Sequence, residues 1–125
     1  MGVSTDAMLY YGMDIICEEE DEPLITRPDD FPEEEWNEDL GWHIERYLTT
    51  KGIAVQVGVH CSYDYPTHYI HVYELTASRG YPVSVVPASL TISESQQAEL
   101  TKALDILKVP MNQRKVGWYL ASLWG

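Results

Sequence analysis

Runs of apolar residues separated by polar turns predict a small domain that contains both strands and helices. Residues 7–16 are apolar almost throughout, which is typical of a strand with neighbours on both sides. Residues 53–61 alternate between apolar and smaller or polar side chains, as a half-buried strand does. Further strands are expected at residues 67–77, at 81–86 on a sheet edge, and at 115–123.

A first helix is expected to begin at Asp30, which has the side chain of an N-cap residue. Glu33, three residues later, completes a pattern similar to a capping box. A cation at Lys51 and a glycine at Gly52 favour the end of the helix there. Its inward face is predicted from the residues at roughly helical spacing, namely Trp36, Leu40, Ile44, Tyr47 and Leu48.

The second predicted helix has the clearest signals. Ser93 is expected to cap it, and Gln96 stands at the third helical position, where it completes a capping box. Val109 and Pro110 end the pattern. The buried positions follow the spacing i, i+3, i+4 and i+7, at Leu100, Ala103, Leu104 and Leu107.

The order of these segments, β-α-β-β-(β)-α-β, predicts the fold class. We expect a single α+β domain over residues 1–125, with an antiparallel sheet of four to five strands and both helices on one face. This order matches the split β-α-β arrangement of ferredoxin-like folds.

Negative charge is concentrated in the first third of the chain. Residues 1–45 hold 15 of the 20 carboxylates and one basic residue, Arg27, whereas residues 46–125 carry a small positive excess of two. Nucleic acids and anionic membrane surfaces are bound through clusters of Lys and Arg, which this chain lacks. The charge therefore argues against direct binding of nucleic acid or membrane.

The two cysteines, Cys17 and Cys61, lie far apart and do not have the spacing of metal ligands. One disulfide between them is an alternative, but two free thiols in a reducing compartment are the favoured interpretation. No apolar run approaches the roughly 20 residues that span a bilayer. We therefore expect a protein of the cytoplasm, with no cofactor.

Residues 60–71 hold three of the four histidines and one cysteine. Neighbours in a strand such as His60 and Cys61 point to opposite faces, so these side chains should not converge on a metal ion. A nucleophilic pair of Cys61 with His60 or His68 is an alternative. However, a reactive thiolate needs an electropositive setting, which the acidic first half opposes, and a buried strand cysteine with surface histidines is the preferred interpretation.

A second candidate for ligand binding combines hydroxyls and carboxylates. If the first strand lies beside the hairpin, a polar cluster could form from Ser4, Thr5 and Asp6 with Ser62 and Asp64. Such residues more often cap turns by bonding to their own backbone. Together with His60, Cys61 and His68, they form the alternative site, for a small ligand or a metal-dependent reaction.

Three short motifs carry a resemblance to a known family. They are Gly2-Val3-Ser4-Thr5-Asp6-Ala7 with Leu9, Tyr11 and Gly12, then His60-Cys61-Ser62-Tyr63-Asp64-Tyr65-Pro66, and finally Gly117-Trp118-Tyr119-Leu120. In these motifs the chain resembles a family of small bacteriophage accessory proteins of unassigned function. The resemblance implies a viral origin and a place in the host cytoplasm, but no reaction.

The preferred function is therefore that of an interaction protein, a monomer or small homo-oligomer, and not an enzyme. Its acidic face would bind a basic surface on a host protein and so inhibit a nucleic-acid-binding or defence machine, such as a CRISPR complex or restriction enzyme, as a mimic of DNA. The expected contact residues are Glu18, Glu19, Glu20, Asp21, Glu22, Asp29, Asp30, Glu33, Glu34, Glu35, Trp36, Glu38 and Asp39.

Overall fold

The computed structural model describes residues 5–17, 24–36, 39–63 and 65–124. The elements in these ranges are β1 (Thr5–Cys17), η1 (Glu33–Trp36), α1 (Leu40–Thr50), β2 (Gln56–Ser62), β3 (Pro66–Ser78), η2 (Pro87–Ser89), α2 (Glu94–Ile106), η3 (Met111–Gln113) and β4 (Gly117–Trp124), where η marks a 3-10 helix. No helix in the described part of the chain is long and apolar enough to cross a membrane.

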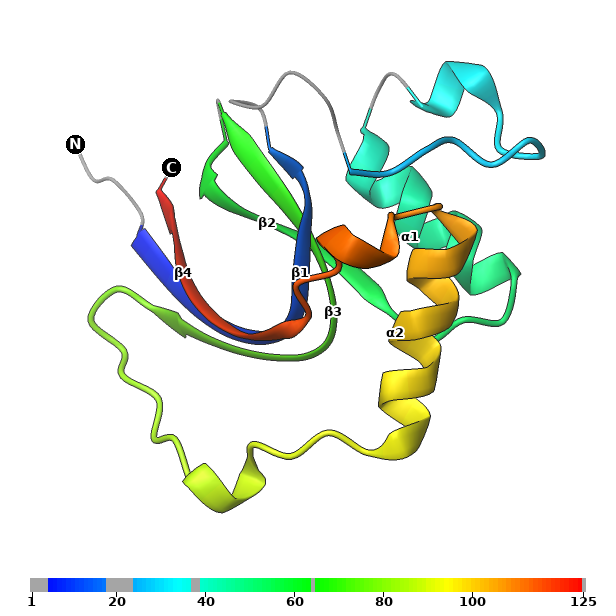
Figure 1. Cartoon of the computed structure of the whole chain (residues 1–125). Coiled ribbons are helices and arrows are strands. Elements are labelled where there is room, and N and C mark those ends of the chain that lie inside the picture. Colours follow the sequence, from blue (N-terminus) through cyan, green and yellow to red (C-terminus); the bar gives the residue numbers. More distant parts are fainter. Residues whose placement is uncertain (1–4, 18–23, 37–38, 64, 125) are drawn as a thin grey trace.

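The four strands form one mixed sheet that closes on itself in the order β1-β3-β2-β4 (Figure 1). The long strand β1 pairs antiparallel with both β3 and β4, as expected for a strand that is apolar almost throughout. Closure depends on a short parallel contact between β2 and β4, where Cys61 faces Leu123 and Ser62 faces Trp124.

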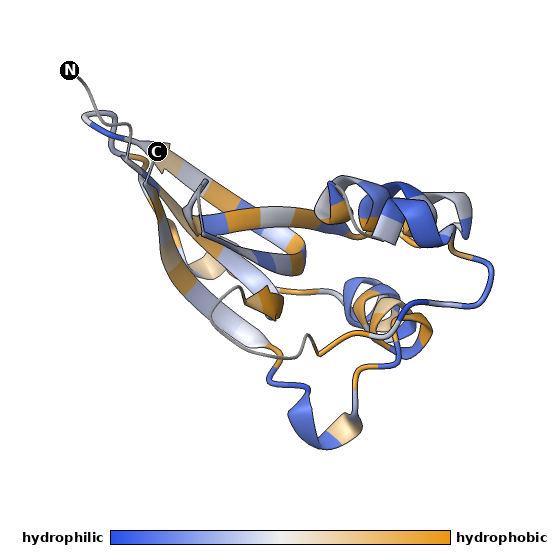
Figure 2. Ribbon diagram, turned by 90° about the horizontal axis from the view of Figure 1, so that it is seen from above, coloured by the Kyte–Doolittle hydropathy of each residue, from blue (hydrophilic) through white to orange (hydrophobic). Residues whose placement is uncertain are grey.

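Two hydrophobic cores lie on different sides of this sheet. Consecutive residues of a strand point to opposite faces, so Tyr69 packs inside the barrel while Ile70 packs towards the helices. In Figure 2 both helices lie at one end of the strands. The larger core, between sheet and helices, includes Met13 and Ile15 of β1, whereas Met8 and Tyr10 of the same strand belong to the barrel interior.

Helix α2 forms as predicted. The Ser93 side chain accepts a hydrogen bond from the Gln96 backbone N–H at 3.1 Å, and the Gln96 side chain accepts one from the Ser93 N–H at 2.9 Å. This capping box satisfies two N–H groups that lack helical partners. The Gln96 amide also donates to the backbone carbonyl of Val72, which ties the helix to β3. All four predicted inward residues are buried: Leu100, Ala103, Leu104 and Leu107.

The prediction of one continuous first helix is wrong at its beginning. A short 3-10 helix, η1, comes first, and α1 starts only after Asp39, whose backbone is left-handed with a φ of 47°. The left-handed region is costly for a residue with a Cβ and interrupts the helical path. The predicted end is confirmed, because Gly52 is left-handed at a φ of 77° directly after the helix.

Asp30 consequently does not cap α1 but contacts its C-terminal end. Its carboxylate accepts hydrogen bonds from the Tyr47 hydroxyl and the Lys51 ammonium. The bond from Lys51, and then the one from Tyr47, holds the pKa of the Asp30 carboxyl below its usual value. The loop before α1 is therefore pinned to the end of the helix that follows it.

The α+β class is confirmed, with two α-helices and a sheet. The fifth strand expected at residues 81–86 does not form, since in this region only an isolated bridge joins Ser78 to Tyr81. Pro82 and Pro87 cannot donate backbone hydrogen bonds, which weakens any pairing of this segment. A ferredoxin-like sheet is not confirmed, because the observed sheet is closed and contains a parallel pair.

Gly12 is required because β1 lies very close to β3 at this position, where the register of the paired strands is irregular. A Cβ at Gly12 would lie 1.8 Å from the carbonyl oxygen of Ile70, a backbone atom that cannot move aside without breaking the pairing. We expect Gly12→Ala to lower the free energy of unfolding by at least about 2 kcal/mol, measured by urea denaturation.

Gly117 supplies the matched control. It is the β4 residue paired with Gly12, and nothing lies within 4 Å of the position of its Cβ. Gly117→Ala should change the free energy of unfolding by less than about 1 kcal/mol. Equal stabilities of the two variants would contradict the close contact between the strands.

Candidate functional site

Two stacked tyrosines occupy the interior of the barrel. The rings of Tyr10, from β1, and Tyr69, from β3, lie 4.0 Å apart between centroids and are 25° from parallel. Both residues are almost fully buried, at 1% and 2% exposed. Stacked aromatic rings are stabilised beyond the area that they bury, but each buried hydroxyl needs a hydrogen-bond partner.

Gly58 of β2 makes room for this stack. A Cβ at this position would lie 2.6 Å from the hydroxyl-bearing carbon of the Tyr69 ring. The glycine therefore lets β2 pass close to the ring, and the strand carries the next functional residue, His60, two positions later on the same face.

The hydroxyl of Tyr10 donates to Asp14 Oδ1 at 2.6 Å, and Nε2 of His60 lies 2.9 Å from the same oxygen. Asp14 lies on β1 four residues after Tyr10, so both side chains share one face of the strand. His60 comes from β2 and is buried at 8% exposed. These contacts form a first group of tyrosine, carboxylate and histidine.

A second group has the same composition. The hydroxyl of Tyr69 donates to Glu74 Oε2, and Nε2 of His71 lies 3.5 Å from that oxygen. The two groups are joined by the stacked rings, since the His71 ring centroid lies 5.2 Å from that of Tyr69. The barrel interior is thus polar around the Tyr10 and Tyr69 hydroxyl groups and apolar where the two rings stack.

Burial and charge keep both tyrosines in the hydroxyl form. Burial is the largest cause that raises the pKa of Tyr10 and of Tyr69 far above its ordinary value. The bonded carboxylates, Asp14 and Glu74 respectively, raise it further because they repel a phenolate. Each tyrosine therefore acts as a fixed hydrogen-bond donor.

Asp14 is kept ionised in this setting. Burial would raise the pKa of its carboxyl, but the hydrogen bonds from His60 and Tyr10 together outweigh burial and lower the pKa. The Asp14 side chain is 44% exposed and reaches a cleft of about 430 Å³ that Lys115 and Tyr119 also line. A stable carboxylate beside His60 fixes the orientation of the imidazole ring.

The other ring nitrogen of His60 contacts a thiol. His60 Nδ1 lies 3.1 Å from Sγ of Cys61, and Cys61 is exposed to solvent. The atoms Cys61 Sγ, His60 Nδ1, His60 Nε2 and Asp14 Oδ1 therefore form one continuous chain of contacts. A nucleophile, a base and a group that orients the base have this arrangement in many enzymes.

The expectation that His60 and Cys61 point to opposite faces is wrong. Cys61 has a φ of 74°, in the left-handed region, so the regular alternation of the strand ends at this residue. Its side chain turns back towards its neighbour instead of entering the core. The expectation of a buried cysteine with surface histidines is therefore also wrong, since Cys61 is exposed whereas His60 and His71 are buried. Such strained backbone at a non-glycine residue often accompanies a functional site.

The second cysteine lies near the first, across Thr67 of β3. The Thr67 hydroxyl lies 3.7 Å from Sγ of Cys17 and 3.7 Å from Sγ of Cys61. Both thiols are free, as expected. Cys17 is partly buried, whereas Cys61 is exposed.

The predicted acidic face is only partly described by the structure. Outside the described residues lie Glu18, Glu19, Glu20, Asp21, Glu22 and Glu38. Of the others, Asp29, Glu33, Glu34 and Asp39 are exposed, Asp30 is paired with Lys51, and Glu35 lies 3.8 Å from His43. The Lys51 cation therefore compensates part of the negative charge of this segment.

Trp36 was expected to anchor a partner, but it is half-buried within the protein. Its ring meets the edge of Phe31 at a centroid distance of 5.1 Å. Trp42 is the more exposed residue, at 57%, and Arg46 lies over its ring. An aromatic contact for a partner would thus come from Trp42.

The predicted cluster of hydroxyls and carboxylates is divided by a strand. Thr5 pairs with Trp124 on one side of β4, while Ser62 faces Trp124 on the other side. Asp6 pairs with Leu123, and Ser4 and Asp64 lie outside the described residues. The Ser62 hydroxyl accepts a hydrogen bond from the Tyr65 N–H at 2.9 Å, so it caps a turn.

His68 does not join His60. The ring of His68 packs against α1, where a Cβ added at Gly41 would lie 2.7 Å from it. His60 instead faces Tyr10 inside the barrel. The described residues contain no group of three or more His, Cys, Asp or Glu side chains placed to hold a metal ion.

Comparison with protein-family models, curated proteins and solved structures gave no match to this chain. The resemblance to small bacteriophage proteins, based on residues 2–7, 60–66 and 117–120, therefore stays a prediction. The chemistry of the site has to be inferred from its own geometry.

Four participants were missed by reasoning from the sequence alone: Tyr10, Asp14, Tyr69 and Glu74. His71 was counted among the histidines of residues 60–71 but was given no role. A signal for two of them was present, since Tyr10 and Asp14 stand at i and i+4 in a strand and so share a face. Their partners come from other strands, and the pairing of β3 with both β1 and β2 brings them together.

Proposed function

We propose that this protein acts through a nucleophilic thiol, with Cys61 as the nucleophile, His60 as its proton acceptor and Asp14 as the group that orients His60. One observation carries the proposal: the 3.1 Å contact from Cys61 Sγ to His60 Nδ1 continues through a 2.9 Å contact to Asp14. The expected reaction class is acyl transfer, in which the Cys61 sulfur bonds to the acyl carbon and the bond from that carbon to the leaving group breaks. The leaving group takes the proton that His60 accepted from the thiol.

The tautomer of His60 follows from the carboxylate. An ionised Asp14 only accepts hydrogen bonds, so the neutral imidazole carries its proton on Nε2 and leaves a lone pair on Nδ1. That lone pair faces the Cys61 thiol and can take its proton. The thiolate is the reactive form of cysteine, and the exposure of Cys61 leaves it open to a reagent.

Alkylation by iodoacetamide tests this proposal in a Cys17→Ser background, where Cys61 is the remaining cysteine. We expect His60→Gln and Asp14→Asn each to slow the alkylation of Cys61 at pH 7 by at least about tenfold, since one removes the base and the other favours the wrong tautomer. The rate is measured by mass spectrometry of the intact protein.

Two controls accompany the alkylation experiment. Cys61→Ser with Cys17 intact gives the rate of the partly buried thiol, which should be lower than that of Cys61. His43→Gln removes a histidine of α1 that contacts Glu35, away from the thiol, and should leave the Cys61 rate unchanged. A Cys61 rate that is the same with and without His60 would refute the proposal.

The function expected from the sequence remains a second proposal. Its support is the exposure of Asp29, Glu33, Glu34 and Asp39 along one segment beside α1, close to the exposed Trp42. A partner with a basic surface, such as a host defence protein in the cytoplasm, would be attracted by these carboxylates. The phage origin and the oligomeric state belong to this proposal.

Charge reversal tests the second proposal. The changes Glu33→Lys and Glu34→Lys together should abolish the recovery of a partner from bacterial lysate, and raising the salt from about 50 to 500 mM should do the same to the unchanged protein. Capture followed by mass spectrometry measures recovery. Glu94→Lys, at an exposed position on α2, should retain the partner. An unchanged partner list after the double reversal would count against the acidic face.

A further inference from the structure

The second cysteine, Cys17, has no part in the proposed acyl transfer. One thiol, its base and the group that orients the base are sufficient for that reaction. Cys17 is far from Cys61 in the sequence, yet the fold places both thiols in contact with the same hydroxyl group, that of Thr67. The position of Cys17 beside the nucleophile is therefore a separate feature of the site.

Three strands bring the two thiols together. Cys17, the last residue of β1, pairs with Thr67 of β3, and Thr67 pairs on its other side with His60 of β2. Residues that are directly paired point to the same face of a sheet, so Cys17, Thr67 and His60 share one face. Cys61 reaches this face because its left-handed backbone turns Sγ towards His60.

The Thr67 hydroxyl limits the distance between the two sulfurs. It lies 3.7 Å from each Sγ, so the sulfurs are at most 7.4 Å apart, which is twice that distance. A disulfide has an S–S distance of about 2 Å, so the two side chains have to move towards each other over Thr67. Both cysteines lie within one position of the end of their strand, where local opening costs least. A local movement is therefore sufficient to join them.

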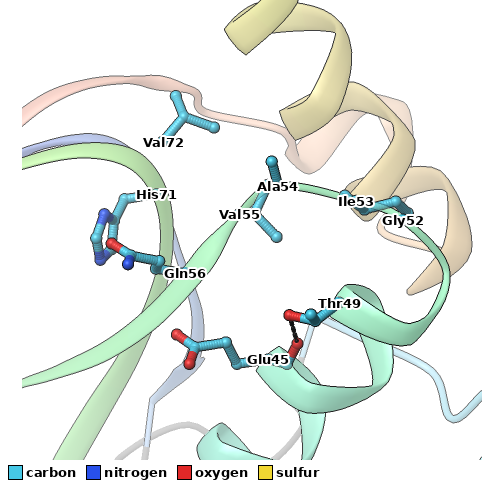
Figure 3. A pocket seen from close by; sticks show the side chains of 9 residues that line it. All are labelled: Glu45, Thr49, Gly52, Ile53, Ala54, Val55, Gln56, His71 and Val72. Carbon is cyan, nitrogen blue, oxygen red and sulfur yellow. Dashed lines mark hydrogen bonds between the residues drawn. The ribbon is translucent and has the colours of Figure 1, made fainter.

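Solvent reaches this pair at Cys61. Cys61 is exposed and Cys17 is partly buried, so a small reagent meets Cys61 first. The cleft of about 580 Å³ beside α1 borders the start of β2 at Gln56 and has neither cysteine in its lining (Figure 3). A reagent that reacts with the thiols is therefore not held by that cleft and has to reach Cys61 from solvent.

We propose that Cys61 reduces small hydroperoxides, such as hydrogen peroxide, and that Cys17 then converts the oxidised thiol to a disulfide. This inference rests on the proposed activation of Cys61 by His60 and Asp14, and it adds a role for Cys17. A sulfenic acid condenses with a neighbouring thiol, and exposed redox-active cysteines often have such a resolving cysteine beside them. Two thiols that share the Thr67 hydroxyl have this arrangement.

The first step oxidises Cys61. His60 takes the proton of the Cys61 thiol, and the thiolate sulfur bonds to one oxygen of hydrogen peroxide. The O–O bond breaks with both electrons on the other oxygen, which takes the proton from His60 and leaves as water. Cys61 is then a sulfenic acid.

The second step forms the disulfide. The Cys17 sulfur bonds to the Cys61 sulfur, and the S–O bond of the sulfenic acid breaks. The departing hydroxide takes the proton of the Cys17 thiol and leaves as a second water. The two sulfurs together lose two electrons, which the peroxide gains, so a single turnover needs no other reactant.

Oxidation of the whole protein by an equimolar amount of hydrogen peroxide tests the inference, with maleimide labelling of the denatured product and mass spectrometry of the intact chain. We expect the unchanged protein to take up two maleimides before oxidation, and afterwards to take up none and to have lost two hydrogens. Cys17→Ser should stop at the sulfenic acid, which dimedone traps at Cys61. In the matched variant Cys61→Ser, the partly buried Cys17 thiol should be oxidised at least about tenfold more slowly.

Three results would overturn the inference. They are maleimide uptake by both thiols after oxidation, a disulfide between two molecules instead of within one, and dimedone trapping in the unchanged protein equal to that in Cys17→Ser. The proposed function would survive each of them if His60→Gln still slows the alkylation of Cys61. Alkylation that does not depend on His60 would refute the proposed function instead, even where the disulfide forms. The maleimide count on the unchanged protein decides the matter if Cys17→Ser fails to fold.

Discussion

Two tyrosine rings stacked at 4.0 Å fill a barrel of four strands, and each ring carries a hydroxyl that must find an acceptor inside it. The acceptors are carboxylates, Asp14 for Tyr10 and Glu74 for Tyr69. Both carboxylates are only partly buried, with side chains 44% and 25% exposed, and a histidine faces each of them from inside the protein. The stack therefore determines which ionisable groups the strands must carry.

One of the two histidines then leads to the candidate site. His60 lies between Asp14 and the exposed thiol of Cys61, so the interior network reaches the surface at a nucleophile. His71 faces Glu74 in the second group, and its side chain stays buried at 4% exposed. The candidate site inherits its geometry from the barrel interior, which is more rigid than a surface loop.

Local patterns predict the elements of this protein but not how they meet. The capping box at Ser93 and Gln96 and the spacing of Leu100 to Leu107 depend on neighbours in sequence, and α2 forms as they indicate. The break at Asp39 was not predicted, because the acidic residues before it suit a helix start equally well. Closure of the sheet was not predicted either, since it depends on a parallel contact between β2 and β4, which are distant in sequence.

For the candidate site too, the sequence indicated some of the residues but not how they meet. His60 and Cys61 were recognised as reactive residues, but strand alternation placed them on opposite faces. The left-handed backbone of Cys61 reverses that conclusion, and such a conformation is not encoded by residue type when the residue is neither Gly nor Asn. Asp14 was assigned to the general acidity of the first half, whereas the structure gives it a specific partner on another strand.

Spectrophotometric titration of the tyrosines tests the interior network most directly. An exposed tyrosine ionises near pH 10, whereas the raised pKa of Tyr10 and Tyr69 keeps both neutral in the folded protein above that pH. In the unfolded chain these two tyrosines lose their protons at a lower pH than they do in the folded protein. The stability that the two buried hydroxyl groups provide is therefore complete below about pH 10 and falls as the pH rises further. We expect Tyr10→Phe and Tyr69→Phe each to leave unchanged the number of tyrosines that ionise between about pH 9 and 11 before alkaline unfolding. Loss of one such tyrosine in either variant would contradict the buried stack.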